Sequence, residues 1–185
     1  MGLRDCLQVC EQACEGSSLR SGDARWIVFR CFALNSTNRD HGELSQHITT
    51  HISTNAGDRK SCLEALALAA DLSNSSEKSS AGHLQLAEKI ILHVFRRNQE
   101  HGSPSSALLE SQLIHLLSPA SSHFFRAESR EFPSTAESSS SWSLPSATAM
   151  AAGHRAMGLL RLLASHTRLL APPCFQSVRE IAAAI

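Results

Sequence analysis

Apolar side chains recur every three to four residues along most of this sequence, and this spacing restricts the chain to amphipathic helices. The pattern is clearest between residues 84 and 99, where the apolar positions are Leu84, Ala87, Ile91, Val94 and Phe95. Alternation of apolar and polar residues, which would indicate strands, is nearly absent. With 185 residues and a hydrophobic content of 42%, the chain can bury a core, so the sequence predicts an all-α fold.

The same pattern divides the chain into successive helical segments. It predicts eight helices, over residues 3–15, 23–34, 44–53, 58–72, 84–99, 103–117, 149–170 and 175–185. Asp58 is a suitable N-cap for the fourth helix, and Pro104 fits the first turn of the sixth. Residues 26–29, Trp-Ile-Val-Phe, also suit a strand, so a strand is the alternative at that point.

The predicted helices group into pairs that begin at residues 3, 44, 84 and 156. Their spacing is about 40 residues once residues 119–148 are set aside as an insertion. We therefore expect antiparallel helix pairs in an α-solenoid-like array, with an irregular bundle of the same helices as the alternative. The expected regions are a helical-repeat region at 1–118, an inserted loop at 119–148 and a final helix pair at 149–185.

The predicted insertion, residues 119–148, is rich in serine and contains Pro133 and Pro145 without any sustained apolar period. Its aromatic side chains are unusual for a freely disordered segment. These are Phe124, Phe125, Phe132 and Trp142. We therefore regard them as candidates for contact with a partner protein.

Charge and cysteine content limit the classes of function. Lys and Arg total 17, as do Asp and Glu, so no net field attracts the chain to nucleic acid or to an anionic membrane. No apolar run approaches the roughly 20 residues of a membrane span, and no secretory apolar segment opens the sequence. The six cysteines lack a disulfide pattern, which predicts reduced, buried thiols and an intracellular protein of the mitochondrion or cytoplasm.

Two residue groups invite a metal or catalytic interpretation. Cys6, Cys10 and Cys14 follow one helix face, but a zinc site normally needs about four ligands, usually in two closely spaced pairs. His47 and His51 lie one turn apart, with His41 nearby, but the glutamate of an H-E-x-x-H motif is absent, so solvent-facing histidines are expected. The sequence also lacks G-x-S-x-G, P-loop and G-x-G-x-x-G motifs. We expect no enzyme, metal, cofactor or small-molecule substrate, and keep a metal-binding or enzymatic bundle as a distant alternative.

Basic residues form the only organised polar pattern. His154, Arg161 and Arg168 are spaced by seven, which predicts a stripe along the helix at 149–170, opposite its leucines. Such a stripe, with the adjacent Arg155, suits contact with a phosphate backbone, although an ordinary solvated face has the same pattern. Arg96 and Arg97 are further candidates, and they equally suit the C-terminal dipole of their helix.

A proline precedes two similar segments, residues 108–117 and the run Ser177-Val178-Arg179-Glu180-Ile181-Ala182. In this pattern the chain resembles the octotricopeptide and heptatricopeptide (RAP-associated) repeat families of organellar RNA metabolism, over less than half of its length. Members of these families are α-solenoids that bind RNA or serve as subunits of organellar ribonucleoproteins, and the resemblance implies the same here.

The expected function is that of a non-catalytic helical-repeat scaffold that contacts other protein subunits in a larger assembly. An organellar ribonucleoprotein, such as a mitochondrial ribosome, is the setting that the resemblance implies. The alternative is a helical-repeat protein that binds RNA directly through its arginines.

Overall fold

A computed structural model describes residues 2–15, 21–35, 41–55, 58–74, 80–100, 103–128 and 147–183. Those parts of the chain are almost entirely helical and contain no strand, so the prediction of an all-α fold is confirmed. The helices are α1 (Leu3–Cys14), α2 (Ser21–Asn35), α3 (His41–Thr54), α4 (Arg59–Ser73), α5 (Ser80–Glu100), α6 (Ser103–Glu128), α7 (Ala147–Ser165) and α8 (Gln176–Ala183). Two short 3-10 helices, η1 (Thr167–Leu170) and η2 (Pro173–Phe175), connect α7 to α8.

Local signals explain where several helices begin. The Asp58 carboxylate accepts hydrogen bonds from the backbone N–H groups of Lys60 and Ser61, at 3.3 Å and 2.9 Å, and so caps α4 as predicted. The strand alternative for residues 26–29 is wrong, because Trp26 and Phe29 share a buried face of α2 with Ala33. Burial of this face favours the helix over the local strand propensity.

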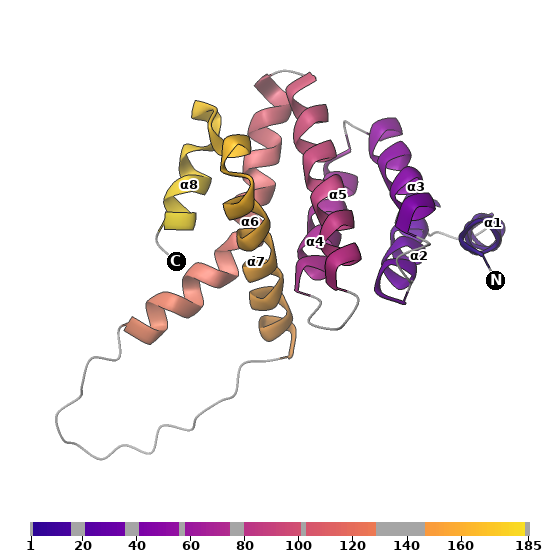
Figure 1. Cartoon of the computed structure of the whole chain (residues 1–185), viewed down its shortest axis with the longest axis horizontal. Coiled ribbons are helices and arrows are strands. Elements are labelled where there is room, and N and C mark those ends of the chain that lie inside the picture. The colour runs from indigo at the N-terminus through magenta and orange to yellow at the C-terminus, as the bar shows by residue number, and fades with distance from the viewer. Residues whose placement is uncertain are drawn as a thin grey trace, which may run out of the picture.

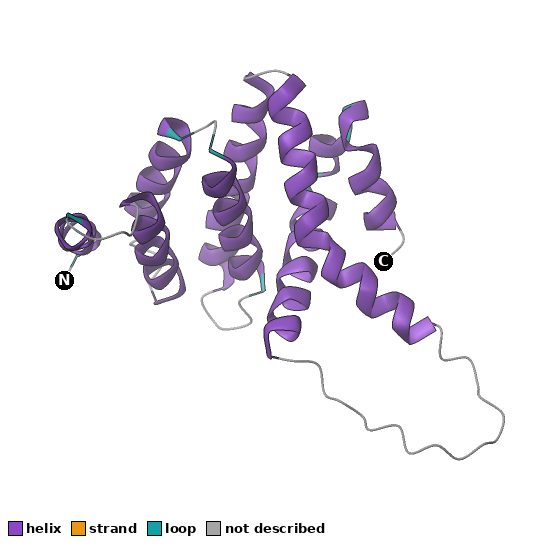
Figure 2. Ribbon diagram, turned by 180° about the vertical axis from the view of Figure 1, so that it is seen from behind, coloured by secondary structure: helices purple, strands orange, loops and turns teal. Residues whose placement is uncertain are grey.

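The sixth helix is longer than predicted, because α6 continues through Pro119 to Glu128. Proline removes one hydrogen bond from a helix and usually bends it. Both ribbon views show α6 changing direction along its length, so the helix bends instead of ending (Figures 1 and 2). The expected inserted loop therefore begins with helical residues, and residues 129–146 lie outside the described part of the chain.

The helix expected over residues 149–170 ends earlier, at Ser165. The backbone of His166 leaves the helical region, with φ −126° and ψ 46°, and the chain then tightens into η1. The two prolines at 172 and 173 follow and lead through η2 into α8.

Along the longest axis of the molecule α1 lies at one end, α2 and α3 come next, α4 and α5 follow side by side, and α6, α7 and α8 lie toward the other end (Figure 1). The buried apolar cluster takes a side chain from each of the eight, namely Leu3, Phe29, Ile48, Leu68, Ile90, Leu113, Leu163 and Val178. None of the described helices combines the length and the apolar character that a membrane span requires.

The packing partners differ from simple sequential pairs at two places. The central helix α4 packs most extensively against α5 and α7, and it is buried on all sides from Ala65 to Ala70. The expected final pair does not form a direct hairpin, because α8 packs mainly on α6 and α7 packs on both α4 and α6. The solenoid arrangement and its period of about 40 residues remain predictions.

Candidate functional site

A groove with a volume of about 520 Å³ lies between α7, η1 and α8. Its lining is mostly apolar and comprises Met157, Leu160, Arg161, Leu163, Ala164, Thr167, Leu170, Arg179, Ala182 and Ala183. Half of these residues are exposed, so the groove is open to solvent along its rim. We call this surface the α7–α8 groove.

The α7–α8 groove follows from the packing of the last helices. Because α7 and α8 both rest on α6, they leave a valley between them. The side chains that face across this valley are small, at Ala164 on α7 and at Ala182 and Ala183 on α8. Leu163 and Leu170 form the base and are only 1% and 5% exposed. The sequence thus leaves apolar surface uncovered where larger side chains would have filled the space.

Positive charge flanks the groove. The Arg179 guanidinium is fixed in place, because its Nη1 donates to the carbonyl oxygens of Leu170 and Ala171 at 2.7 Å and 3.0 Å. Its Nη2 also donates to Oε1 of Gln176 at 2.7 Å. Arg161 is exposed on the opposite wall. None of the residues described as lining the groove carries a carboxylate, so its local charge is positive.

The predicted basic stripe is only partly built. His154 and Arg161 are exposed on α7, but Arg168 lies on η1 because the helix ends at Ser165. The seven-residue spacing therefore does not continue along one helix face. Among the described residues, neither Arg161 nor Arg168 forms an ion pair, which leaves both guanidinium groups available near the groove.

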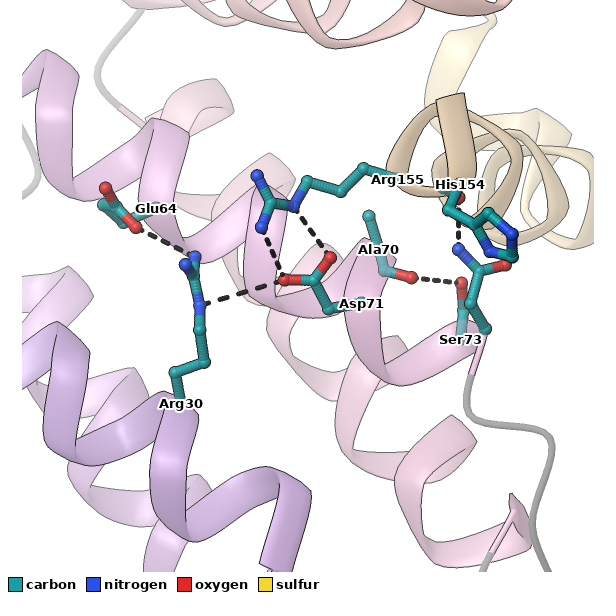
Figure 3. A network of polar contacts seen from close by, with 8 residues as sticks. Arg30, Glu64, Ala70, Asp71, Ser73, His154 and Arg155 are labelled. Atoms are coloured by element: carbon teal, nitrogen blue, oxygen red, sulfur yellow. Dashed lines mark hydrogen bonds and ion pairs between the residues drawn. The ribbon is translucent and has the colours of Figure 1, made fainter. Parts of the chain in front are cut away.

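Arg155, another predicted phosphate contact, has a structural partner instead. Its Nε and Nη2 donate to the two carboxylate oxygens of Asp71 on α4, at 2.7 Å and 3.1 Å (Figure 3). This hydrogen-bonded carboxylate raises the pKa of Arg155, which thus stays charged. A bidentate pair of this kind holds α7 on α4, and it occupies the face of the guanidinium that a phosphate would need.

Asp71 also faces a second arginine. Arg30 Nε, on α2, lies 3.8 Å from Asp71 Oδ2, and Arg30 Nη2 donates to Oε2 of Glu64 at 3.0 Å (Figure 3). These four side chains are between one fifth and one third exposed. The network therefore connects three helices, α2, α4 and α7.

Replacing Asp71 by asparagine is expected to lower the free energy of unfolding by about 1–2 kcal/mol, because Arg155 and Arg30 lose the charge that balances them. Urea denaturation of both proteins measures the difference. Glu100→Gln is the control. Glu100 forms exposed ion pairs with Arg96 and Arg97, so its replacement should lower the free energy of unfolding by less than Asp71→Asn does. Equal losses in the two variants would contradict a structural role for the network.

Arg96 and Arg97 lie at the end of α5, as predicted, and both contact Glu100. Arg96 Nε is 3.3 Å from Oε1 of that residue and Arg97 Nη1 is 2.9 Å from Oε2. The hydrogen bond from Arg97 is the main cause of a lowered pKa at Glu100. Part of the positive charge at this helix end is therefore balanced locally.

The aromatic candidates for partner contact fall outside what the structure describes. Phe132 and Trp142 belong to residues 129–146. Phe124 and Phe125 belong to α6, but their side chains are outside the described set. Their proposed role in partner contact thus stays a prediction.

The expectation of solvent-facing histidines is wrong for two of them. His41 and His51 are only 8% and 5% exposed. The His51 ring packs edge-on against Trp26 and Phe29, with centroid distances of 5.3 Å and 5.8 Å. Both histidines share the inner face of α3 with Leu44 and Ile48, and this helical spacing could have revealed their burial. His47 is partly exposed, with Nε2 3.8 Å from Oε1 of Glu43.

Burial lowers the pKa of His51 below its ordinary value of 6.5, and the nearby Arg25 lowers it further, while Asp58 opposes them. The unfolded chain therefore binds more protons just below pH 6.5, and the free energy of unfolding should fall as the pH falls through that value. Urea denaturation at about pH 7.5 and about pH 5.5 tests this. His51→Phe should flatten the dependence but not abolish it, because burial also lowers the pKa of His93. An unchanged dependence in His51→Phe would count against the assignment.

The six cysteines are free, but the expectation of buried thiols is wrong, because five of them are only partly buried and Cys31 is exposed on α2. Cys62 is the most strongly perturbed, since desolvation raises the pKa of its thiol to about 12. In the described part of the chain, no three His, Cys, Asp or Glu side chains cluster in a way that would hold a metal ion.

A second hollow of about 410 Å³ lies between α1, α2 and α3, and polar side chains form much of its lining. Its arginines already have carboxylate partners: Arg4 Nε lies 2.9 Å from Oε1 of Glu43, and Arg25 pairs with Glu11. Because these opposite charges balance, the hollow provides little net field for a charged ligand. The α7–α8 groove, with unbalanced arginines and an apolar base, is the better candidate for a binding surface.

Comparison of the chain with protein-family models, with curated proteins and with solved structures gives no match.

Proposed function

We propose that this chain is a non-catalytic helical scaffold that acts as a subunit of a larger assembly, with the α7–α8 groove as its contact surface for another protein. The observation that carries this proposal is the apolar base of the groove, open to solvent between two helices. Apolar surface of this kind, bordered by charge, is typical of a protein-binding site.

The outer face of α2 supports the same function. Ile27 and Leu34 are 59% and 47% exposed, and Cys31 lies between them on this face. The opposite face of α2 is also apolar, since Trp26, Phe29 and Ala33 belong to the core. A helix that is apolar on both faces is usually covered on both, so a further subunit on α2 would complete its burial.

The test is the size of the native complex. A tagged chain, expressed in cells of the source organism, is expected to migrate in a complex heavier than its own 20.0 kDa. Ala164→Trp fills the groove and should shift the chain toward the monomer, with far-UV circular dichroism confirming that it folds. Ala151→Trp is the matched control, because Ala151 is exposed on the same helix outside the groove. A wild-type chain that is monomeric in native extracts would refute the proposal.

Direct RNA binding is the second candidate function, and the exposure of Arg161 and Arg168 supports it. A ribonucleoprotein, including an organellar one, is the setting suggested by the resemblance to the octotricopeptide families. Arg161→Glu together with Arg168→Glu should then weaken RNA association and flatten its salt dependence. Unchanged RNA association across a salt series would exclude this mechanism.

A further inference from the structure

We infer that the occupant of the α7–α8 groove is an amphipathic helix of a partner protein whose apolar side chains are flanked by Asp or Glu. This inference rests on the proposed function, since it specifies the partner for the same surface.

The shape of the groove suits a helix. Its walls present positions 157, 160, 161 and 164 of α7 and positions 179, 182 and 183 of α8, each with the spacing of one helix face. Small residues at Ala164, Ala182 and Ala183 leave room for ridges of larger side chains from a third helix. Met157 at the rim is flexible and can adjust to the shape of such a helix.

The charges select an acidic partner. Arg179 uses three N–H donors on Leu170, Ala171 and Gln176, which fixes the guanidinium and leaves two of its five donors for a ligand. A side chain fixed in advance loses little conformational entropy on binding. Arg161 stands on the other wall, so carboxylates on both edges of a bound helix would each meet an arginine.

Glu180, the neighbour of Arg179 on α8, does not line the groove, and its carboxylate accepts a hydrogen bond of 2.7 Å from Gln176. Among the residues that the structure describes, neither Arg161 nor Arg179 forms an ion pair with a carboxylate. The positive rim therefore has no internal counter-charge at the groove. An acidic helix would supply it, whereas a basic helix would be repelled.

The same chemistry disfavours RNA as the occupant. Recognition of single-stranded RNA depends on aromatic platforms for the bases as well as on phosphate contacts. The groove lining, as far as the structure describes it, is aliphatic and contains no aromatic ring. Its apolar base would be left uncovered by a phosphate backbone held at the rim.

Site-specific photo-cross-linking in cells of the source organism tests the inference on the full chain. Met157, at the rim, is replaced by p-benzoylphenylalanine, and the cross-linked peptides are identified by mass spectrometry. Met150 carries the same replacement as the control, because it is exposed on α7 outside the groove. We expect position 157, but not position 150, to capture a segment with apolar residues at helical spacing and adjacent Asp or Glu.

Charge reversal then tests the role of the arginine. Arg161→Glu should lower the cross-linking yield about tenfold, and changing the captured acidic residues to Lys should restore it. Arg96→Glu, at the end of α5, is the control for a general change of charge and should leave the yield unchanged.

The outcomes separate this inference from the proposed function. A captured protein segment without acidic residues, or a yield that Arg161→Glu leaves unchanged, overturns the acidic helix but keeps the protein-binding groove. Capture of nuclease-sensitive RNA overturns both and favours the second candidate function. If position 157 captures no protein that position 150 does not also capture, both the acidic helix and the protein-binding groove are overturned.

Discussion

Replacing Gly158 by alanine is expected to lower the free energy of unfolding by about 3 kcal/mol, because α7 approaches the end of α4 too closely for a methyl group. A Cβ at this position would lie 2.2 Å from the carbonyl oxygen of Ala70. It would also meet the side chains of Ser73 and Asn74, at 2.5 Å and 2.6 Å. The nearest obstacle is backbone, so the two helices must separate, and urea denaturation measures the cost.

The separation would also disturb the polar contacts around this point. Ser73 Oγ donates to the Ala70 carbonyl at 2.9 Å, and the Asn74 side chain donates to the carbonyl of His154 (Figure 3). These contacts lie beside the Arg155–Asp71 pair, which depends on the same helix spacing. The loss in Gly158→Ala should therefore exceed that expected for Asp71→Asn.

Gly42→Ala is the matched control for this prediction. Gly42 is also a helical glycine, on α3, but it is exposed and a Cβ there would have no atom within 4 Å. Alanine should be neutral or stabilise this variant by up to about 0.5 kcal/mol, because it favours the helix. Equal stability of the two variants would contradict the close approach of α4 and α7 at Gly158.

The existence of the helices could be predicted from the sequence, because it depends on local signals. Apolar spacing located all eight, and the cap at Asp58 fixed the start of α4. The errors occurred where tertiary context outweighs local preference. The helix α6 continues past Pro119 instead of ending before it, and the helix predicted over residues 149–170 breaks at His166, where no proline or glycine indicates a break.

The candidate site could not be predicted as a unit, because it depends on which helix faces meet. Arg155 and Asp71 are 84 residues apart, so spacing along the chain gives no sign of their pairing. Arg161 was identified as a basic candidate, but Arg179 and the small residues Ala164, Ala182 and Ala183 were not. Gly158 had a usable signal, since a glycine inside a helix is unfavourable unless close packing requires it.

Replacing Phe175 by alanine is expected to destabilise the α8 end of the molecule by about 3 kcal/mol, through lost burial and the cavity left behind. Phe175 is 2% exposed, and its ring centroid lies 5.3 Å from that of Phe95 on α5. A helix as short as α8 is not stable alone, so it depends on this anchor and on Val178.

Because α8 follows the anchor at the end of the described chain, the loss should appear first as local opening. Hydrogen exchange followed by mass spectrometry should show faster exchange in peptides covering residues 173–183, with little change in α4. Phe175→Leu keeps most of the buried volume and should cost about 1 kcal/mol. Uniformly faster exchange throughout the chain would contradict the local anchor.

The same substitution connects stability to the proposed function. The α8 wall of the groove carries Arg179, Ala182 and Ala183, so opening of α8 removes one side of the binding surface while the other helices stay folded. In Phe175→Ala the yield of the photo-cross-link from position 157 should therefore fall in proportion to the opening of α8 that hydrogen exchange measures. Phe175→Leu should retain most of it. A cross-link that persists in Phe175→Ala, despite fast exchange in α8, would mean that the partner contacts α7 alone.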